Sequence, residues 1–295
     1  MPLPPKQEQK FSERQLRAML ENGLADAVQQ ILDINPSIQF KIEYKEGVPT
    51  LVDMVTGAAF WLKRFITEDP DTIEMKKAAM KASKMEYEVL IYGETGTGKE
   101  LIAQSMIGDR TGAFLSINCA GLPENLIESE LFGHVAGAFT GAIGQRQGIM
   151  AASKEGVFFL DEIGELPLQV QGKLLRALQT KKVRMIGDKE EKPISCRFVS
   201  ASNKNIPVMV KQGLFRSDLY ARISTLELDI KPLRNRKCDI IPILKYIGDD
   251  LRIENEVKEF LAKYERDITN DTLDLSLNVR SLERAIKRFH TWKHV

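Results

Sequence analysis

The sequence has few cysteines, and they lie far apart. Cys119, Cys196 and Cys238 are the three among 295 residues, and none has a partner at the short spacing of a zinc site. An odd number of scattered cysteines also argues against a disulfide framework. We therefore expect neither structural zinc nor disulfide bonds, in agreement with a reducing compartment.

Long apolar runs and a surplus of one charge are also missing. No stretch approaches the roughly 18 consecutive apolar residues of a membrane-spanning helix, and the polar N-terminus, MPLPPKQEQKFSER, has no apolar signal core. The 42 basic residues nearly balance the 41 acidic ones, so net charge favours neither nucleic acid nor a membrane surface as a partner. These absences predict a soluble, cytoplasmic protein without a membrane partner.

Residues 1–66 are expected to form a small α+β module. Apolar residues recur at helical spacing after Ser12, a residue type that often caps helices. Residues 38–44 then alternate apolar and polar side chains, as a strand does, before a KEG turn and a second candidate strand. No motif identifies the role of this module, so a packing or assembly role and a sensory or partner-binding role both stay open.

Residues 67–233 alternate strand and helix patterns. Four apolar segments predict buried strands, at 87–93, 115–118, 156–161 and 196–203. Helical segments separate them, an order that predicts a layered α/β domain with a mostly parallel sheet. The remainder, residues 234–295, reads as helical and predicts a small helical domain.

The segment GETGTGKE, residues 93–100, joins the first of these strands to a helix. In that context the glycines let backbone N–H groups surround phosphates, Lys99 reaches the terminal phosphates, and the helix N-terminus adds a partial positive charge. The pattern predicts a phosphate-binding loop for ATP. Its candidate residues are Gly93, Glu94, Thr95, Gly96, Thr97, Gly98, Lys99 and Glu100.

Glu100 departs from the generic loop, which has Ser or Thr here to bind Mg2+. The metal must then be held mainly elsewhere, and the strand in GVFFLDEIGELP ends in two carboxylates. We expect Asp161 to hold Mg2+, through water, and Glu162 to orient and deprotonate the attacking water. Asn203 ends the fourth strand, where it contacts the γ-phosphate or the attacking water, or serves only as a turn residue.

Four segments carry a resemblance to a known family. They are GETGTGKE, INCAGLPENLIESELFGHVAGAFTGA, GVFFLDEIGELPLQVQGKLLRALQ and FRSDLYARI. Together they resemble the AAA+ domain of bacterial enhancer-binding proteins, the NtrC-type activators of sigma-54 RNA polymerase, over about residues 67–236. GAFTGA distinguishes this family among AAA+ ATPases, and its members commonly carry GTGKE, which accounts for Glu100. The resemblance implies a P-loop AAA+ three-layer domain with a helical lid.

The resemblance also implies roles that the residues alone do not. Asn118 would partner Glu162 until the nucleotide state changes, although a strand-end turn residue is the alternative for Asn118. Arg216 and Arg222 resemble the arginines that reach the ATP of a neighbouring subunit and neutralise transition-state charge. Arginines acting in trans imply self-association into a ring, which is hexameric in this family.

The lid is where the match weakens. The family usually has WPGNVREL, whereas this chain has LSLNVRSLERA, which keeps Asn278, Val279 and Arg280 but lacks the Trp, Pro, Gly and following acidic residue. Arg280 is the candidate ATP sensor, with a solvated arginine on a helix face as the alternative. Whether a reduced lid responds to nucleotide stays open.

The stretch LFGHVAGAFTGAIGQRQG, residues 131–148, lies between two segments of helical pattern. Glycine costs about 0.5 to 1 kcal/mol in a helix interior, so its five glycines predict an interrupted helix. By resemblance it is a mobile loop that contacts the client protein, and the alternative is a flexible loop with Phe139 in the core. The candidate contact residues are Gly137, Ala138, Phe139, Thr140, Gly141 and Ala142.

We recognise no receiver domain before the ATPase domain and no helix-turn-helix after it, so no DNA-binding domain is expected. The basic end, RSLERAIKRFHTWKHV, contacts nucleic acid or is a solvated lid helix. We expect an ATP-hydrolysing activator that contacts sigma-54 RNA polymerase and remodels the closed promoter complex. The alternatives are a related ATPase with another client, or a non-catalytic ring or decoy subunit.

Overall fold

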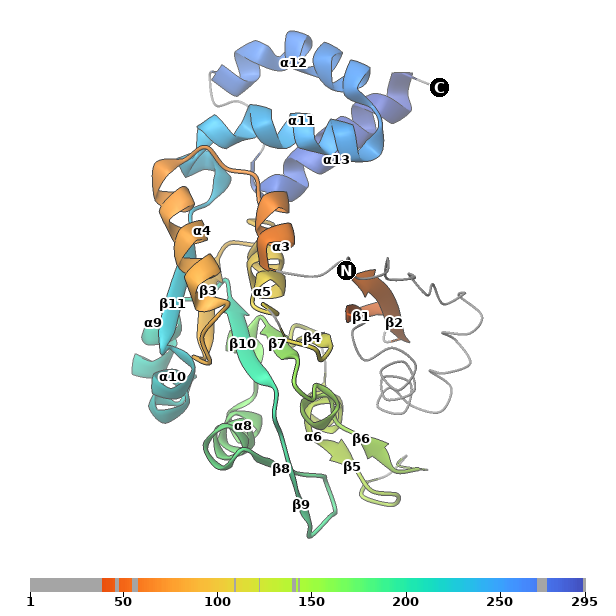
Figure 1. Ribbon diagram of the computed structural model, residues 1–295, viewed down its shortest axis with the longest axis vertical. Helices are drawn as coiled ribbons and strands as arrows, with labels where there is room; N and C mark the ends of the chain where they lie inside the picture. The colour runs from red at the N-terminus through yellow and green to blue at the C-terminus, as the bar shows by residue number, and fades with distance from the viewer. Residues whose placement is uncertain are drawn as a thin grey trace, which may run out of the picture.

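The computed structural model describes residues 39–45, 48–54, 58–108, 110–121, 123–139, 142, 144–269 and 275–293. The helix predicted after Ser12 and the loop residues Thr140 and Gly141 lie outside these ranges. Within them the chain forms a central sheet with helices on both faces, and three further helices lie beyond one end of the sheet (Figure 1).

Seven strands form the central sheet, in the spatial order β11, β3, β10, β7, β4, β1 and β2. Every neighbouring pair from β11 to β1 is parallel, and the β1–β2 hairpin at the edge is antiparallel. The strands are β1 Gln39–Lys45, β2 Val48–Met54, β3 Val89–Gly93, β4 Phe114–Asn118, β7 Val157–Asp161, β10 Arg197–Ser202 and β11 Leu226–Ile230. The predicted mostly parallel α/β sheet is confirmed.

Helices on both faces explain why the inner strands read as nearly continuous apolar runs. In β7, Val157 and Phe159 point to one face of the sheet, whereas Phe158 and Leu160 point to the other. The first face packs against α3 Ala58–Arg64, α4 Pro70–Ala82 and α5 Lys99–Ser105.

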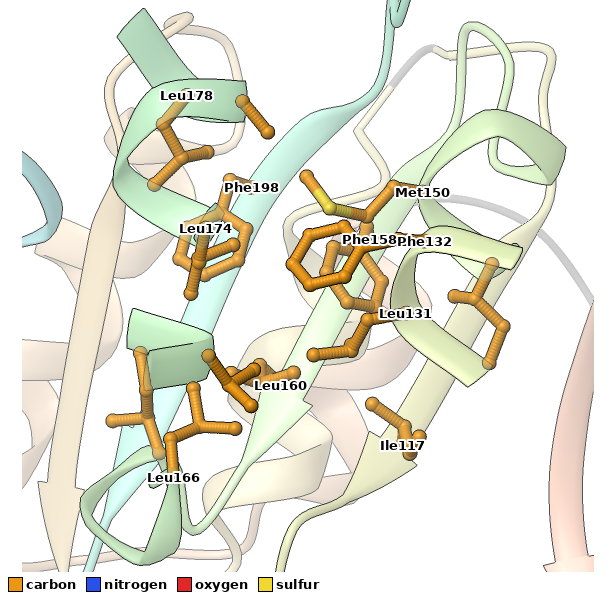
Figure 2. Close-up of a cluster of buried hydrophobic side chains, with 14 of the residues drawn as sticks. Ile117, Leu131, Phe132, Met150, Phe158, Leu160, Leu166, Leu174, Leu178 and Phe198 are labelled. Atoms are coloured by element: carbon orange, nitrogen blue, oxygen red, sulfur yellow. The ribbon is translucent and has the colours of Figure 1, made fainter. Parts of the chain in front are cut away.

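The second face carries the larger core, shown in Figure 2 around Phe158 and Phe198. It packs against α6 Glu124–Phe132, α7 Ile149–Ala152, α8 Leu168–Thr180, α9 Ile206–Lys211 and α10 Ser217–Ile223. These helices bury their apolar side chains against the same side of the sheet.

Strand β11 is absent from the strands predicted above. Its residues alternate, with Leu228 and Ile230 buried and Glu227 and Asp229 exposed, as an edge strand requires. It pairs with β3 as far as Gly93, so it supports the strand that leads into the phosphate-binding loop.

The predicted interruption between two helices is confirmed, and the glycine-rich stretch that forms it is a hairpin. Strands β5 Gly133–His134 and β6 Arg146–Gln147 pair antiparallel between α6 and α7. Gly133 has φ +81°, and a Cβ there would lie 2.5 Å from the Arg146 carbonyl oxygen, so glycine permits the close approach of the strands. The hairpin therefore connects α6 and α7, and both of these helices pack in the core on the second face.

The leading strands β1 and β2 belong to the same sheet as the strands of residues 67–233. Strand β1 pairs with β4 at Lys41↔Phe114 and Ile42↔Leu115. Helix α3 follows and buries Trp61 and Leu62 against the first face. Residues on both sides of the predicted boundary at residue 66 therefore share one sheet and one core, while the boundary itself stays a prediction.

Three helices at the C-terminal end pack around their own core. They are α11 Ile240–Leu251, α12 Glu254–Thr269 and α13 Val279–Lys293. Leu244, Phe260, Leu282 and Ile286 are among the residues buried between them. We call this group the lid. Across the described ranges, no helix is long and apolar enough to cross a membrane.

Candidate nucleotide-binding site

Residues 93–100 turn from β3 into α5 at the carboxyl end of the sheet. Gly96 and Gly98 have φ of +80° and +104°, a region that glycine adopts without steric cost. The Lys99 side chain folds back into the turn, where Nζ donates to the Gly93 carbonyl oxygen at 2.8 Å. The segment therefore has the shape of an anion-binding nest with a buried lysine at its centre.

The remaining loop residues brace this turn or face the space beside it. The Thr97 hydroxyl donates to the Glu94 carbonyl oxygen at 2.8 Å, which closes the turn. The Glu94 carboxylate faces outward and pairs with Arg234 in the connection to the lid. Glu100 lies in the first turn of α5 and lines the adjoining cavity.

Asn118 and Asp161 lie side by side at the ends of β4 and β7. The two residues are register partners, and Asn118 Nδ2 donates to Asp161 Oδ2 at 3.2 Å. The structure thus gives Asn118 a different partner, and the expected nucleotide-dependent pairing with Glu162 stays a prediction. Because Glu162 follows the end of β7 by one residue, its side chain leaves the row of paired residues and cannot share the register contact.

Glu162 faces the phosphate-binding loop instead. Its backbone is left-handed, with φ +53°, which is uncommon for a non-glycine residue. Glu162 Oε1 lies 3.4 Å from Lys99 Nζ, and Oε2 accepts the backbone N–H of Asn203 at 3.0 Å. Asn203 Nδ2 in turn lies 3.4 Å from the Thr95 hydroxyl. Residues that follow β3, β7 and β10 are thus joined by hydrogen bonds at the carboxyl end of the sheet.

Burial raises the pKa of Asp161 to about 6, and the neighbouring Glu162 charge adds to the effect. A poorly hydrated carboxylate beside a second acid suits a divalent cation. Mg2+ is commonly held by one or two carboxylates together with phosphate oxygens and water, which fits Asp161. Within the described part of the chain no cluster of three or more His, Cys, Asp or Glu residues could hold a metal without such added ligands.

A cavity of about 560 Å3 opens beside these side chains. Its polar wall is formed by Thr95, Lys99, Glu100, Asn118, Asp161, Glu162 and Asn203. Its apolar wall comes from the segment after α3 and from the lid, and includes Phe65, Ile66, Ile243, Ile247 and Val279. A cavity of this size, polar at one end and apolar at the other, suits a nucleotide with its phosphates at the polar end.

Arg236 and Asp239 are central to the site but were not singled out by the sequence. Arg236 is buried, donates to Asp239 Oδ2 at 2.9 Å and to the Thr97 carbonyl oxygen at 3.0 Å, and lies over the Phe65 ring. Asp239 also accepts the Glu68 backbone N–H at 2.6 Å. In the sequence these residues stand in a charged connection, PLRNRKCD, with no sign of their burial.

Arg280 lies in the first turn of α13, exposed, with its side chain along the cavity. It makes no side-chain hydrogen bond or ion pair with another described residue, so it is free to meet a ligand. The neighbouring Asn278 is fully buried against the phosphate-binding loop.

Arg216 directly precedes α10 and Arg222 lies in its last turn, away from these residues. The Arg216 guanidinium pairs with Asp218 Oδ2 at 2.7 Å, and that of Arg222 pairs with Glu88 Oε1 at 3.0 Å. Both side chains are partly exposed, 46% and 38% respectively. Neither is among the described residues that line the cavity of its own chain.

The described part of the GAFTGA stretch, residues 137–139 and 142, lies in the connection between β5 and β6 (Figure 1). Gly137, with φ +77°, donates its backbone N–H to the Ala142 carbonyl oxygen at 2.8 Å. Phe139 lies edge-on to the His134 ring, with centroids 5.0 Å apart, and is 37% exposed. Phe139 is therefore not in the core, and Ala138 also lies within the turn.

A second hairpin supports this loop. It consists of β8 Lys182–Arg184 and β9 Glu191–Pro193. The Val135 backbone N–H donates to the Ile186 carbonyl oxygen at 3.1 Å, and the Ile186 N–H donates to the Gly133 carbonyl oxygen at 2.8 Å. Sequence reasoning missed β8 and β9 because each is short and mostly polar.

Comparison with known proteins gives a consistent match. The family model described as sigma-54 interaction domain matches residues 65–229. The regulatory protein AtoC of Escherichia coli (strain K12) is 40% identical over 235 residues, covering 76% of this chain and 49% of AtoC. The Nif-specific regulatory protein of Azorhizobium caulinodans is 38% identical over 256 residues, covering 85% of this chain and 41% of that protein.

Solved structures show the same fold. NtrX from Brucella abortus in complex with ATP matches with a TM-score of 0.64 and 21% identity, over 76% of this chain and 49% of NtrX. The Hsp104–ADP complex of S. cerevisiae matches with a TM-score of 0.53 and 21% identity, over 77% of this chain and 45% of that chain. The chain spans about half the length of the curated relatives it matches. The α/β AAA+ fold is thereby established.

Proposed function

Because the chain belongs to the sigma-54 interaction domain family, we propose that it is an AAA+ ATPase that activates transcription by sigma-54 RNA polymerase. The observation that carries the proposal is the meeting of Lys99, Asp161 and Glu162 at the polar end of one cavity. Its apolar end, between α3 and the lid, would receive the adenine base.

Each residue at the polar end has a role that follows from its position. The backbone N–H groups of the loop and Lys99 would hold the phosphates. Asp161 would hold Mg2+, which when bound neutralises charge on the phosphate oxygens. Glu162 would accept a proton from the attacking water, because its carboxylate is held between Lys99 and the Asn203 backbone at the carboxyl end of the sheet.

Asn118 and Asn203 would orient the reactants without exchanging protons. Asn118 fixes one oxygen of Asp161 through its amide, which sets the direction of the carboxylate. The Asn203 amide points to Thr95 and thus to the phosphate end of the cavity. The Arg280 guanidinium would contact the triphosphate from the lid side.

We propose further that Arg216 and Arg222 act on the ATP of a neighbouring subunit in a ring, which we expect to be hexameric. Their exposure and their distance from the cavity lining of their own chain support a role in trans. A guanidinium that enters the neighbour's site would stabilise charge as the γ-phosphate is cleaved.

The client would be sigma-54, contacted by residues 137–142 at the tip of the β5–β6 hairpin. The exposed Phe139 supports this role, since an exposed apolar side chain is suited to protein contact. A related ATPase with another client is the second candidate, favoured by the leading strands that lie outside the matched family region. A non-catalytic subunit is disfavoured because Glu162 and both arginines are present.

Steady-state ATP hydrolysis tests the catalytic assignment. Glu162→Gln should lower the rate at least about 100-fold, as expected when a general base is removed, while ATP binding persists. Glu165→Gln is the matched control, because Glu165 also lines the cavity but pairs with Lys204 outside the polar end. Unchanged hydrolysis by the Glu162 variant would refute the assignment.

Binding to purified sigma-54 with ADP and an aluminium or beryllium fluoride tests the client. Binding that depends on the analogue and is lost in Phe139→Ala supports sigma-54. No binding by the wild-type chain at high protein concentration, with hydrolysis intact, would exclude sigma-54 and favour another client.

A further inference from the structure

Two carbonyl groups of the phosphate-binding loop, those of Thr95 and Gly96, face the lid. The Gly96 carbonyl oxygen accepts the backbone N–H of Val279 at 3.1 Å, and the Thr95 carbonyl oxygen accepts Asn278 Nδ2 at 3.1 Å. A Cβ at Gly96 would lie 2.1 Å from the Leu277 carbonyl oxygen, so the two segments are in backbone contact. The lid thus touches the loop itself and not only the rim of the cavity.

Asn278 is shaped for this contact. Its backbone is left-handed, with φ +55°, and its side chain is fully buried. Oδ1 accepts the backbone N–H of Leu233 at 2.6 Å, and Nδ2 lies 3.3 Å from Glu94 Oε2 as well as bonding Thr95. One amide therefore joins the loop to the connection that leads into the lid.

An ion pair lies on the outer side of the same contact. Both guanidinium N–H groups of Arg234 donate to the two carboxylate oxygens of Glu94, at 2.6 and 2.5 Å. The pairing with Arg234 lowers the pKa of the Glu94 carboxyl, which keeps it charged. Because both carboxylate oxygens are bonded, this bidentate pair fixes the orientation of the Glu94 side chain as well as its distance from Arg234.

These contacts would affect anion binding because they fix the direction of the loop's peptide groups. A loop whose N–H groups converge on phosphates must turn its carbonyl groups outward, and an outward carbonyl that is buried needs a donor. Asn278 and Val279 supply two of those donors. Without them the carbonyls would compete for other partners, and the convergent arrangement of N–H groups would lose its support.

We propose that Asn278, together with the Glu94–Arg234 ion pair, is a positioning element through which the lid holds the phosphate-binding loop in its anion-binding form. The inference rests on the proposed ATP site, and it assigns Asn278 and Arg234 a role distinct from that of Arg280. Arg280 lines the cavity, whereas Asn278 and Arg234 do not line it and contact the loop from outside.

The test measures binding of ADP and of pyrophosphate to the full chain by calorimetry. Asn278→Gly keeps the left-handed backbone and removes the amide, so it should weaken both ligands about tenfold or more, the loss expected from two hydrogen bonds. Pyrophosphate has no base to enter the apolar wall, so its loss reports on the loop alone. Arg252→Gly is the matched control. Arg252 also has a left-handed backbone but is exposed, so this variant should bind as the wild type does.

A double-mutant cycle tests the ion pair. Glu94→Gln and Arg234→Gln should each weaken pyrophosphate binding, and the double variant should be no weaker than the singles, because either change removes the same pair. Restored binding in the exchanged pair, Glu94→Arg with Arg234→Glu, would support the positioning role further.

The outcomes separate this inference from the ATP site on which it rests. If the wild-type chain binds neither ADP nor pyrophosphate, the proposed ATP site fails. If the wild type binds both and Asn278→Gly binds pyrophosphate equally well, the positioning role is refuted while the ATP site stands. An equal loss in the Arg252→Gly control would also refute it, because any lid substitution would then suffice.

Discussion

At the scale of single residues, charge and burial decide most of the chemistry. Asp69 illustrates this, because it is nearly buried at the start of α4, where Oδ2 accepts the Thr72 backbone N–H at 2.9 Å and the Thr72 hydroxyl at 2.7 Å. Burial opposes its charge, yet the hydrogen bonds from Thr72 and the nearby Lys231 lower the pKa of Asp69 overall.

Asp69→Ala should lower the free energy of unfolding by about 1 kcal/mol at pH 7, the usual cost of losing a helix cap. Because the pKa of Asp69 is lowered in the folded state, its contribution is complete above the pKa of an unfolded aspartate and is lost as pH falls through the folded value. The deficit should therefore hold down to about pH 4 and shrink below it. Urea unfolding at pH 7, 5 and 3.5 measures this.

Asp71→Ala is the control for this change, because Asp71 lies in the same helical turn but is exposed. It should alter stability little at any of the three pH values. An equal deficit in both variants would mean that negative charge near the helix N-terminus, and not the cap at Asp69, stabilises α4.

The cysteines should differ in reactivity for the same reasons. Burial raises the pKa of the Cys119 thiol well above its usual range and that of Cys196 to about 12, whereas Cys238 is exposed. Brief treatment of the native chain with iodoacetamide at pH 7.5 should modify Cys238 alone, and treatment in urea should modify all three. Rapid native modification of Cys196, seen by peptide mass spectrometry, would contradict its buried position directly before β10.

At the scale of elements, two hairpins act as one support for the GAFTGA loop. Backbone hydrogen bonds join Ile186 to Val135 and to Gly133, and a Cβ at Gly187 would lie 3.0 Å from the Ala138 Cβ and from Val135 Cγ2. The loop and the β8–β9 hairpin are therefore in close contact at the point where the loop begins.

Gly187→Ala should displace the loop and weaken sigma-54 binding at least about fivefold, while ATP hydrolysis stays within about twofold of the wild type. Gly213→Ala is the matched control, since Gly213 also has positive φ but a Cβ there would meet no atom within 4 Å. Both variants bear the left-handed strain of alanine, and Gly187→Ala adds the close contacts with Ala138 and Val135, so a stability measurement must show that both stay folded in the assay. Equal sigma-54 binding by the two would show that the β8–β9 hairpin does not position the loop.

At the scale of the whole molecule, the proposed arginines need a neighbour. Glu162→Gln and Arg216→Ala should each hydrolyse ATP slowly alone. A mixture should recover activity, because a site with an intact Glu162 can then receive Arg216 from the other variant, and random mixing places such a pair at about a quarter of the interfaces.

Hydrolysis rates of the two variants, separately and mixed, are compared at one total concentration well above that needed for assembly. Mixed rates equal to the average of the separate ones would place Arg216 outside the neighbour's site. A rate per subunit that does not depend on protein concentration would argue against a ring.

Much of the site was predictable because its chemistry is local in sequence. The loop at 93–100 lies between a strand and a helix, and Asp161 and Glu162 end an apolar strand, so residue type and position sufficed. The partner of Asn118 was not predictable in this way. Strand register decides that contact, and the register places Asn118 opposite Asp161.

The sequence by itself determined the alternation of apolar strands and helices, the phosphate-binding loop and the acids that follow β7, because each depends on residues close together in the chain. Only the tertiary structure decided that the β1–β2 hairpin joins the edge of the sheet, that Arg236 and Asp239 are buried beneath the loop, and that Asn278 reaches Thr95 from the lid. These contacts join residues up to 183 positions apart, and burial of their charges and amides follows from packing between segments that no local pattern relates.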